Sequence, residues 1–274
     1  MRNSSHPITN KQKLSFTFNG KKYFGYKGDT LASALIANNV KIVGRSFKYH
    51  RPRGIFSAGS EEPNALVELG DGPYKEPNTR ATNIELFDGL EGSSQNFLGS
   101  VNFDFMAIND LLKNFIGAGF YYKTFMWPRR FWEKLYEPII RRAAGLGKLS
   151  LKADPSQYDK GYLHCDFLII GSGISGLMSA LLLAETGSEV LIIEEDFILG
   201  GRLNSESFAI NGKQCSVWIG QAVKKLKSLK NVRILTRTTV FAAFDHGIFT
   251  AIEKKTDHIL EKSSKPRQIN WKIY

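Results

Sequence analysis

Three glycines between residues 171 and 176 carry the clearest chemical signal in the chain. Gly171, Gly173 and Gly176 form a G-x-G-x-x-G turn directly after an apolar run at 167–170. Gly171 allows a tight turn, Gly173 lets backbone approach a pyrophosphate with no Cβ between them, and Gly176 allows close helix–strand packing. The turn therefore predicts a dinucleotide site, with the pyrophosphate at the N-terminus of the helix that follows.

The residues after the turn complete a βαβ unit. Apolar residues at helical spacing between 177 and 184 predict a helix, and Gly187 ends it. A second apolar strand at 190–193 leads to Glu194, whose carboxylate stands where it can accept hydrogen bonds from the ribose of an adenosine half. This order of elements is far more specific than the glycine pattern alone.

The residues around the second strand bear on the choice of nucleotide. Glu194 favours NAD or FAD over NADP, because a carboxylate repels a 2′-phosphate, although Arg202 could weaken that repulsion. Gly200 and Gly201 follow the strand, as a glycine pair does in flavoproteins with two dinucleotide domains, or as a simple turn would. The sequence leaves NAD and FAD both open.

The N-terminal region predicts a small sheet with one helix. Leu14, Phe16 and Phe18 alternate before Asn19-Gly20, a type I′ hairpin signal, and a helix capped by Asp29 or Thr30 follows. Hairpin, helix, long loop and strand is the order of a β-grasp domain. Plant-type ferredoxins of that fold hold a [2Fe–2S] cluster through loop cysteines. Because residues 45–58 contain no cysteine, the sequence predicts a domain without an iron–sulfur cluster.

Composition limits the class of protein. The chain has 274 residues, of which 42% are hydrophobic and 23% charged, enough for about two domains. Its net charge of +11 is spread along the sequence, which indicates solvated surface and argues against nucleic-acid binding. Without an apolar run of about 18 residues or a signal peptide, no membrane is expected, and a cytoplasmic location is predicted. Cys165 and Cys215 are too isolated for a disulfide framework or a metal site.

Five longer segments show a family resemblance. They are 44–54 (GRSFKYHRPRG), 59–67 (GSEEPNALV), 105–112 (FMAINDLL), 118–128 (AGFYYKTFMWP) and 136–147 (YEPIIRRAAGLG). With these segments the chain resembles the alpha subunit of heterotetrameric sarcosine oxidase over nearly its whole length. The fold class expected is α+β and α/β, in three parts. A ferredoxin-like β-grasp domain without cluster cysteines takes residues 1–95, a helical connector 96–160, and an incomplete Rossmann-type FAD/NAD(P)-binding domain 161–274.

The connector and the C-terminal region complete the expected elements. Apolar residues at helical spacing between 105 and 115 predict an amphipathic helix, and Pro138 starts or kinks a second one. Their apolar faces fit either packing between domains or a surface for another subunit. A third strand is expected at 232–235, a hairpin at 239–253, and a strand at 269–274 that returns toward the Rossmann sheet. His50 and its neighbouring cations either bind an anion or hold the loop through carbonyl groups.

The resemblance implies a function for the complete protein. Such an enzyme oxidises sarcosine with O2 to glycine and H2O2, and gives 5,10-methylenetetrahydrofolate when tetrahydrofolate is present. The implied partners are the beta, gamma and delta subunits, the amine substrate and tetrahydrofolate. The implied cofactors are NAD in this chain, with FAD as the alternative, and FMN and FAD in the full complex with the beta subunit.

The resemblance also assigns site residues, all of them to the cofactor and none to catalysis or a metal. They are Gly171, Ser172, Gly173, Ser175, Gly176, Glu194, Gly200, Gly201 and Arg202. The Ser175 hydroxyl either contacts phosphate or serves the start of the helix. Since the family's subunit continues well beyond this length, the chain is expected to be a fragment that is inactive alone.

Two alternatives stay open at this point. One is a subunit of a related opine or amino-acid dehydrogenase or of hydrogen cyanide synthase, although many of those keep cluster cysteines. The other is a scaffold without catalysis that binds nucleotide or partner subunits only.

Overall fold

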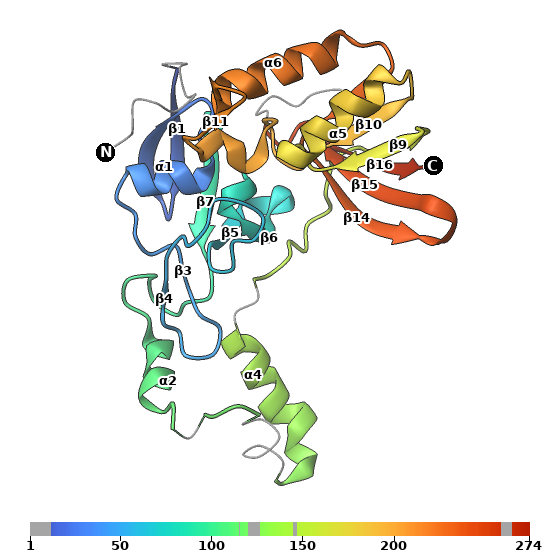
Figure 1. Cartoon of the computed structure of the whole chain (residues 1–274). Helices are drawn as coiled ribbons and strands as arrows, with labels where there is room; N and C mark the ends of the chain where they lie inside the picture. The colour runs from blue at the N-terminus through green and yellow to red at the C-terminus, as the bar shows by residue number, and fades with distance from the viewer. Residues whose placement is uncertain (1–11, 115, 120–126, 145–146, 259–264) are drawn as a thin grey trace. The chain divides into compact units, whose positions relative to one another are not determined.

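A computed structural model of the chain describes residues 12–114, 116–119, 127–144, 147–258 and 265–274. These residues form two compact units, one that ends at Pro155 and one from Ser156 to Tyr274 (Figure 1). Each unit has its own sheets and its own buried core. The three-part division at 95/96 and 160/161 stays a prediction. No helix in the described part of the chain is long and apolar enough to cross a membrane.

A five-stranded sheet with the order β2-β1-β7-β5-β6 forms the first unit. Its strands are β1 (Lys13–Phe18), β2 (Lys21–Tyr26), β5 (Leu66–Leu69), β6 (Glu76–Arg80) and β7 (Leu90–Ser94). The pair β1 and β7 is parallel, and the other pairs are antiparallel. The short helices η1 (Gly72–Tyr74) and η2 (Ala81–Asn83) flank β6.

The hairpin β1–β2 turns through Asn19 and Gly20. Both residues have positive φ, 52° and 74°, which is the type I′ geometry that the Asn-Gly pair predicted. The register pairs Phe18 with Lys21 and Phe16 with Tyr23. The alternating side chains Phe16 and Phe18 are therefore both buried on one face.

Helix α1 (Leu31–Ala37) covers this sheet. The Thr30 hydroxyl accepts from the Ser33 N–H at 3.1 Å, and the Ser33 hydroxyl accepts from the Thr30 N–H at 3.0 Å, which forms a capping box. The helix ends at Asn38. The buried apolar core of the unit consists of Leu14, Phe16, Phe18, Leu31, Ala32, Ala34, Leu35, Val43, Ala65, Val67, Ala81, Ile84, Leu86 and Leu90.

The loop from 54 to 65 is organised around a buried carboxylate, that of Glu62. It accepts hydrogen bonds from the backbone N–H groups of Phe56 (2.8 Å), Ser57 (2.5 Å), Asn64 (2.8 Å) and Ala65 (3.1 Å). Burial by itself would raise the pKa of Glu62, but these four hydrogen bonds lower it below its ordinary value of 4.5. One ionised side chain thus satisfies four donors of a segment without regular structure.

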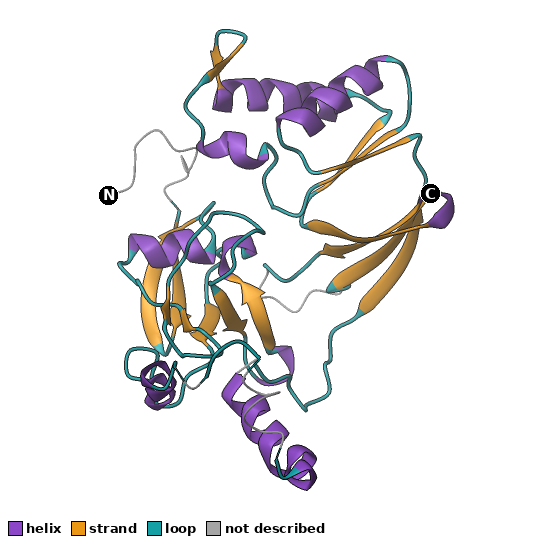
Figure 2. Cartoon of the chain, turned by 60° about the horizontal axis from the view of Figure 1, so that its bottom comes forward, coloured by secondary structure: helices purple, strands orange, loops and turns teal. Residues whose placement is uncertain are grey.

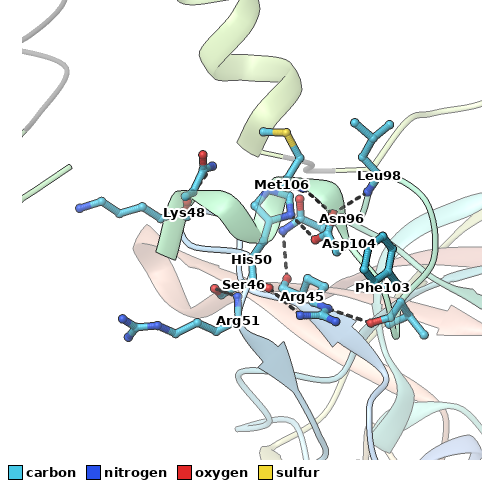
Figure 3. Close-up of polar contacts among 12 residues, drawn as sticks. Arg45, Ser46, Lys48, His50, Arg51, Asn96, Leu98, Phe103, Asp104 and Met106 are labelled. Atoms are coloured by element: carbon cyan, nitrogen blue, oxygen red, sulfur yellow. Dashed lines mark hydrogen bonds and ion pairs between the residues drawn. The ribbon is translucent and has the colours of Figure 1, made fainter. Parts of the chain in front are cut away.

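A second buried carboxylate, that of Asp104, contacts the hairpin formed by β3 (Gly44–Arg45) and β4 (Pro52–Arg53) through His50, which lies in the loop of that hairpin (Figure 3). Asp104 Oδ2 lies 2.6 Å from His50 Nδ1, and both side chains are at most 3% exposed. Asp104 Oδ1 accepts from the N–H groups of Leu98 and Met106 at 2.9 and 3.0 Å. The pair therefore links the hairpin to the segment that follows the sheet.

Three cations of the same hairpin bind oxygens of that following segment. Arg45 donates to the carbonyls of Val101 and Asn102 at 2.8 and 3.0 Å. Lys48 donates to the carbonyl of Gly117 at 2.9 Å, and Arg51 to Asp110 at 2.7 Å. For these residues the structure supports the role of holding the loop rather than that of binding an anion.

In the described part of the segment after the sheet, the helices are short. They are η3 (Phe105–Ala107), α2 (Ile108–Leu111), η4 (Arg129–Phe131), η5 (Trp132–Tyr136) and α4 (Glu137–Ala144). The single amphipathic helix predicted from 105 to 115 is thus divided, because Asp104 caps a 3-10 turn through the Met106 N–H. Residue 115 and most of the aromatic stretch, 120–126, lie outside the described residues. Pro138 lies in the first turn of α4, where its missing N–H is tolerated.

The second unit contains the predicted βαβ unit (Figure 1). Strands β9 (Phe167–Ile170), β10 (Val190–Ile193) and β13 (Val232–Leu235) form a parallel sheet in the order β13-β10-β9. Helix α5 (Ile174–Glu185) connects β9 to β10, and α6 (Cys215–Ser228) precedes β13. The four residues of β10 are all buried, as expected for a central parallel strand.

A second, mixed sheet of four strands completes this unit (Figure 2). It contains β14 (Thr238–Phe244), β15 (Ile248–Lys254), β16 (Gln268–Ile273) and β8 (Tyr158–Leu163), in that order. The remaining short elements are η6 (Gly201–Ser205), β11 (Ala209–Ile210), β12 (Lys213–Gln214) and η7 (Asp245–Gly247).

The last strand, expected to return toward the Rossmann sheet, does not pair with it, although its Ile273 packs in one buried cluster with Leu191 and Ile193 of β10. Strand β16 pairs with β15 and β8 instead. Trp271 explains this position, because its indole N–H donates to Glu253 on β15 at 2.9 Å. Its ring also occupies the place of a side chain at Gly161 on β8, where a Cβ would lie 2.3 Å from the ring.

Removing the charge of Glu62 is expected to destabilise the first unit. In Glu62→Gln, an NH2 group faces backbone donors, and we expect a loss of about 2–3 kcal/mol at pH 7 in urea unfolding. Because the folded-state pKa is lowered, the stabilisation is present above pH 4.5 and is lost as the pH falls through the folded-state value. The exposed neighbour Glu61 provides the control Glu61→Gln. Equal stability of both variants and wild type at pH 7 would refute the role of Glu62.

Truncating Asp104 tests the second carboxylate. We expect Asp104→Ala to lose about 3 kcal/mol in the same assay, because it leaves His50 and two backbone N–H groups without their buried partner. Asp110→Ala is the matched control, since its ion pair with Arg51 is about half exposed, and its loss should be much smaller. A loss for Asp104→Ala no larger than that of the control would contradict this interpretation.

Candidate functional site

The glycine turn between β9 and α5 is the centre of the candidate site. Gly171 has a φ of +90°, a conformation that residues with a Cβ rarely adopt. A Cβ on Gly176 would lie 2.0 Å from the Gly171 carbonyl oxygen. The two glycines therefore allow the first turn of the helix to pass directly over the end of the strand.

The middle glycine, Gly173, is different because it faces open space. It is the N-cap of α5 and makes no side-chain cap. A Cβ built on it meets no atom within 4 Å. The twelve-residue helix thus presents its first N–H groups and its positive dipole end at a place where backbone is accessible. This geometry suits an anionic group such as a pyrophosphate.

Glu194 lies at the end of β10, next to this turn. Its side chain accepts from the Ser172 N–H at 2.7 Å and from the Ser172 hydroxyl at 2.6 Å, both on Oε2. Oε1 accepts from the Asp196 N–H at 3.0 Å. Glu194 is only 7% exposed, so the structure holds its carboxylate in one place beside the glycine turn.

The glycine pair after β10 packs against the same turn. Gly200 and Gly201 have φ of +115° and +50°. The Gly200 N–H donates to the Ser172 carbonyl and hydroxyl oxygens, both at 3.1 Å. A Cβ on Gly201 would lie 3.3 Å from the Gly173 Cα. The close approach of two backbones explains why glycines stand here.

Two of the predicted residues lie at the margin of the site. Arg202 is 91% exposed in its side chain and forms an ion pair with Glu206 at 3.1 Å, so it offers Glu194 no compensation. Ser175 is exposed in the first turn of α5. The structure thus brings seven of the nine predicted residues together and leaves these two outside the hydrogen-bonded centre.

Asp196 also takes part in the site, although the sequence pattern assigned it no role. The Asp196 N–H donates to Glu194, and the Asp196 carbonyl accepts from the Arg237 N–H at 3.0 Å. Its carboxylate accepts from the Phe197 N–H at 2.8 Å. The available signal in the sequence was a short acidic side chain directly after a strand, because Asp at such a position commonly accepts a hydrogen bond from a nearby backbone N–H.

Two family comparisons each match part of one unit. Residues 169–223 match the family described as NAD(P)-binding Rossmann-like domain. Residues 11–96 match the family described as 2Fe-2S iron-sulfur cluster binding domain. The fold is therefore a ferredoxin-like domain followed by a Rossmann-like nucleotide-binding domain.

The second match corrects the prediction of a domain without an iron–sulfur cluster, because the family as a whole is described by that cluster. The prediction relied on the cysteines of one loop, whereas the match rests on the whole domain. The residues present do not fit cysteine ligation, since Cys165 and Cys215 both lie outside 11–96. Among the described residues, no group of three or more His, Cys, Asp or Glu side chains could hold a metal ion.

Two curated relatives are similar to this chain along almost its whole length. The sarcosine oxidase subunit alpha of Rhizobium meliloti (strain 1021) is 52% identical over 261 residues, which are 95% of this chain and 26% of the relative. That of Corynebacterium sp. (strain U-96) is 30% identical over 92% of this chain and 22% of its own length. The chain thus spans about a quarter of the length of these relatives.

A solved structure supports the fold alone. The crystal structure of L-proline dehydrogenase from P. horikoshii aligns with 99% of this chain and 41% of its own at a TM-score of 0.54 and 20% identity. The sequence relatives, by contrast, confirm the resemblance that the five segments indicated: over nearly its whole length, the chain is similar to the alpha subunits of sarcosine oxidase.

Proposed function

We propose that the second unit binds NAD as part of an oxidoreductase subunit of the sarcosine oxidase type. The observation that carries this proposal is the meeting of the glycine turn, the open N-terminus of α5 and the fixed carboxylate of Glu194. The first two suit the pyrophosphate, and the third suits the ribose of the adenosine half. The Rossmann-like family match over residues 169–223 supports it.

In this proposal the residues of the chain bind and orient the nucleotide and do not carry out the oxidation. The N–H groups of α5 neutralise the pyrophosphate, Gly173 leaves room for it, and Glu194 orients the ribose. Bound NAD would supply hydride-transfer chemistry. Among the nine predicted residues only Glu194 and Arg202 are charged, and neither is predicted to act as a catalytic acid or base.

The reaction of the complete enzyme is proposed from the relatives, whose name is that of sarcosine oxidase. We propose oxidative demethylation of sarcosine with O2 to glycine and H2O2, with transfer of the one-carbon unit to tetrahydrofolate. The substrate chemistry would take place outside the part of the protein in this chain. The beta, gamma and delta subunits are the proposed partners, and the cytoplasmic location stays a prediction.

Replacing Gly173 tests the nucleotide site. Because a Cβ there meets open space in the protein, Gly173→Val should fold as the wild type does but exclude the pyrophosphate. We expect NAD affinity to fall about 100-fold in calorimetric titration, which equals about 2.7 kcal/mol. Gly220→Val, at an exposed site on α6 that is also open, is the control and should keep its affinity. Retention of NAD by Gly173→Val would disprove the assigned turn, and binding of FAD instead of NAD by the wild type would correct the nucleotide.

The charge of Glu194 is expected to decide between NAD and NADP. In Glu194→Gln the repulsion of a 2′-phosphate disappears, so the preference for NAD over NADP should fall about tenfold. The measurement is the ratio of the two dissociation constants in the wild type, in Glu194→Gln and in the neighbouring control Glu195→Gln. An unchanged ratio in Glu194→Gln would place the adenosine ribose elsewhere.

A further inference from the structure

Ser172 is a buried residue at a position to which the glycine pattern assigns no role. It is the first x of G-x-G-x-x-G, and its relative exposure is 0%. A buried hydroxyl costs free energy unless it is hydrogen-bonded. The Ser172 hydroxyl is bonded in both directions: it donates to Glu194 Oε2 at 2.6 Å and accepts from the Gly200 N–H at 3.1 Å.

The hydrogen bonds of the Glu194 carboxylate leave it one acceptor direction. An ionised carboxylate has about four acceptor positions. Two on Oε2 are taken by the Ser172 N–H and hydroxyl, and one on Oε1 by the Asp196 N–H. One position on Oε1 is left for a ligand. Ser172 therefore decides which oxygen of Glu194 is available and how the carboxylate is rotated.

We propose that Ser172 is a positioning residue that fixes the Glu194 carboxylate to accept one hydroxyl of the adenosine ribose, and so sets the preference for ribose over 2′-deoxyribose. The inference rests on the proposed function, because it assumes that a dinucleotide occupies this site. It adds a specificity-determining contact that acts on the nucleotide only through another side chain.

The backbone connections around Ser172 allow its hydroxyl to be tested separately from the fold. In Ser172→Ala the Ser172 N–H still donates to Glu194, and the Gly200 N–H still donates to the carbonyl of residue 172 at 3.1 Å. Only the hydroxyl contacts are lost. Glu194 is still present beside the glycine turn, and the Ser172 N–H still donates to its Oε2. The substitution therefore changes the orientation of the carboxylate and does not remove it.

The experiment measures the dissociation constants of NAD and of its 2′-deoxyadenosine analogue on the full chain by calorimetric titration. We expect the wild type to prefer NAD, and Ser172→Ala to lower that preference about tenfold, the usual effect of one hydrogen bond to a charged group. Ser172→Cys replaces the hydroxyl by a somewhat larger thiol, which is a weaker donor, and should also lower the preference. Ser179→Ala, an exposed serine of α5, is the control and should match the wild type.

A double-mutant cycle with Glu194→Gln shows whether Ser172 acts through Glu194. In the Glu194→Gln background, Ser172→Ala should leave the ratio of the two dissociation constants unchanged. Equal weakening of both ligands by Ser172→Ala, or an unchanged ratio in the single variant, would overturn the inference while the proposed function stands. Failure of the wild type to bind NAD would overturn both together, and it would do so before any variant is compared.

Discussion

The second unit depends on the close approach of backbone segments that have no side chain between them. The first turn of α5 crosses the end of β9 where Gly176 faces the Gly171 carbonyl, and the chain after β10 returns to within contact of Gly173 at Gly201. Because these backbones lie so close together, the N–H groups of Ser172, Asp196 and Gly200 all donate to the Ser172 hydroxyl or the Glu194 carboxylate. The Glu194 carboxylate and the Ser172 hydroxyl then connect those segments by hydrogen bonds that are shielded from water. In the proposed site, the same shielding would make the remaining acceptor of Glu194 selective, because a ligand group that leaves it unsatisfied loses affinity.

Buried carboxylates perform a related task in the first unit. Glu62 satisfies four backbone N–H groups of an irregular loop, and Asp104 satisfies two together with His50. In each case a side-chain carboxylate replaces the partners that a strand or helix would have provided. Long segments without regular structure around the five-stranded sheet are thus connected by hydrogen bonds to buried carboxylates.

The similarity to sarcosine oxidase alpha subunits indicates that both units correspond to part of a longer kind of protein. The chain covers about a quarter of such a relative, and its identity with one of them is 52% over nearly all of its own residues. The nucleotide-binding geometry is present within this quarter, whereas the proposed amine chemistry belongs to the complete protein. The proposed nucleotide site uses backbone groups and one carboxylate, so the proposal asks of this chain binding and orientation rather than catalysis.

The sequence by itself determined those features that depend on residues close together along the chain. The Asn19-Gly20 turn, the cap of α1 and the order of strand, glycine turn and helix at 167–185 all follow from local backbone preferences. The five family segments likewise identified the relatives without any structure. In contrast, the absence of loop cysteines was an insufficient basis for excluding a cluster-binding family, because family membership rests on the whole domain.

Only the tertiary structure decided which distant groups meet. Ser172 and Glu194 are 22 residues apart, and the burial of the serine and the number of bonds on the carboxylate depend on the register of β9 against β10. The placement of β16 beside β8 also depends on a partner far away in the sequence. Hydrogen bonding and packing between such partners outweigh local propensity, so a pattern of residue types predicts the elements but not the contacts that position the carboxylate of Glu194.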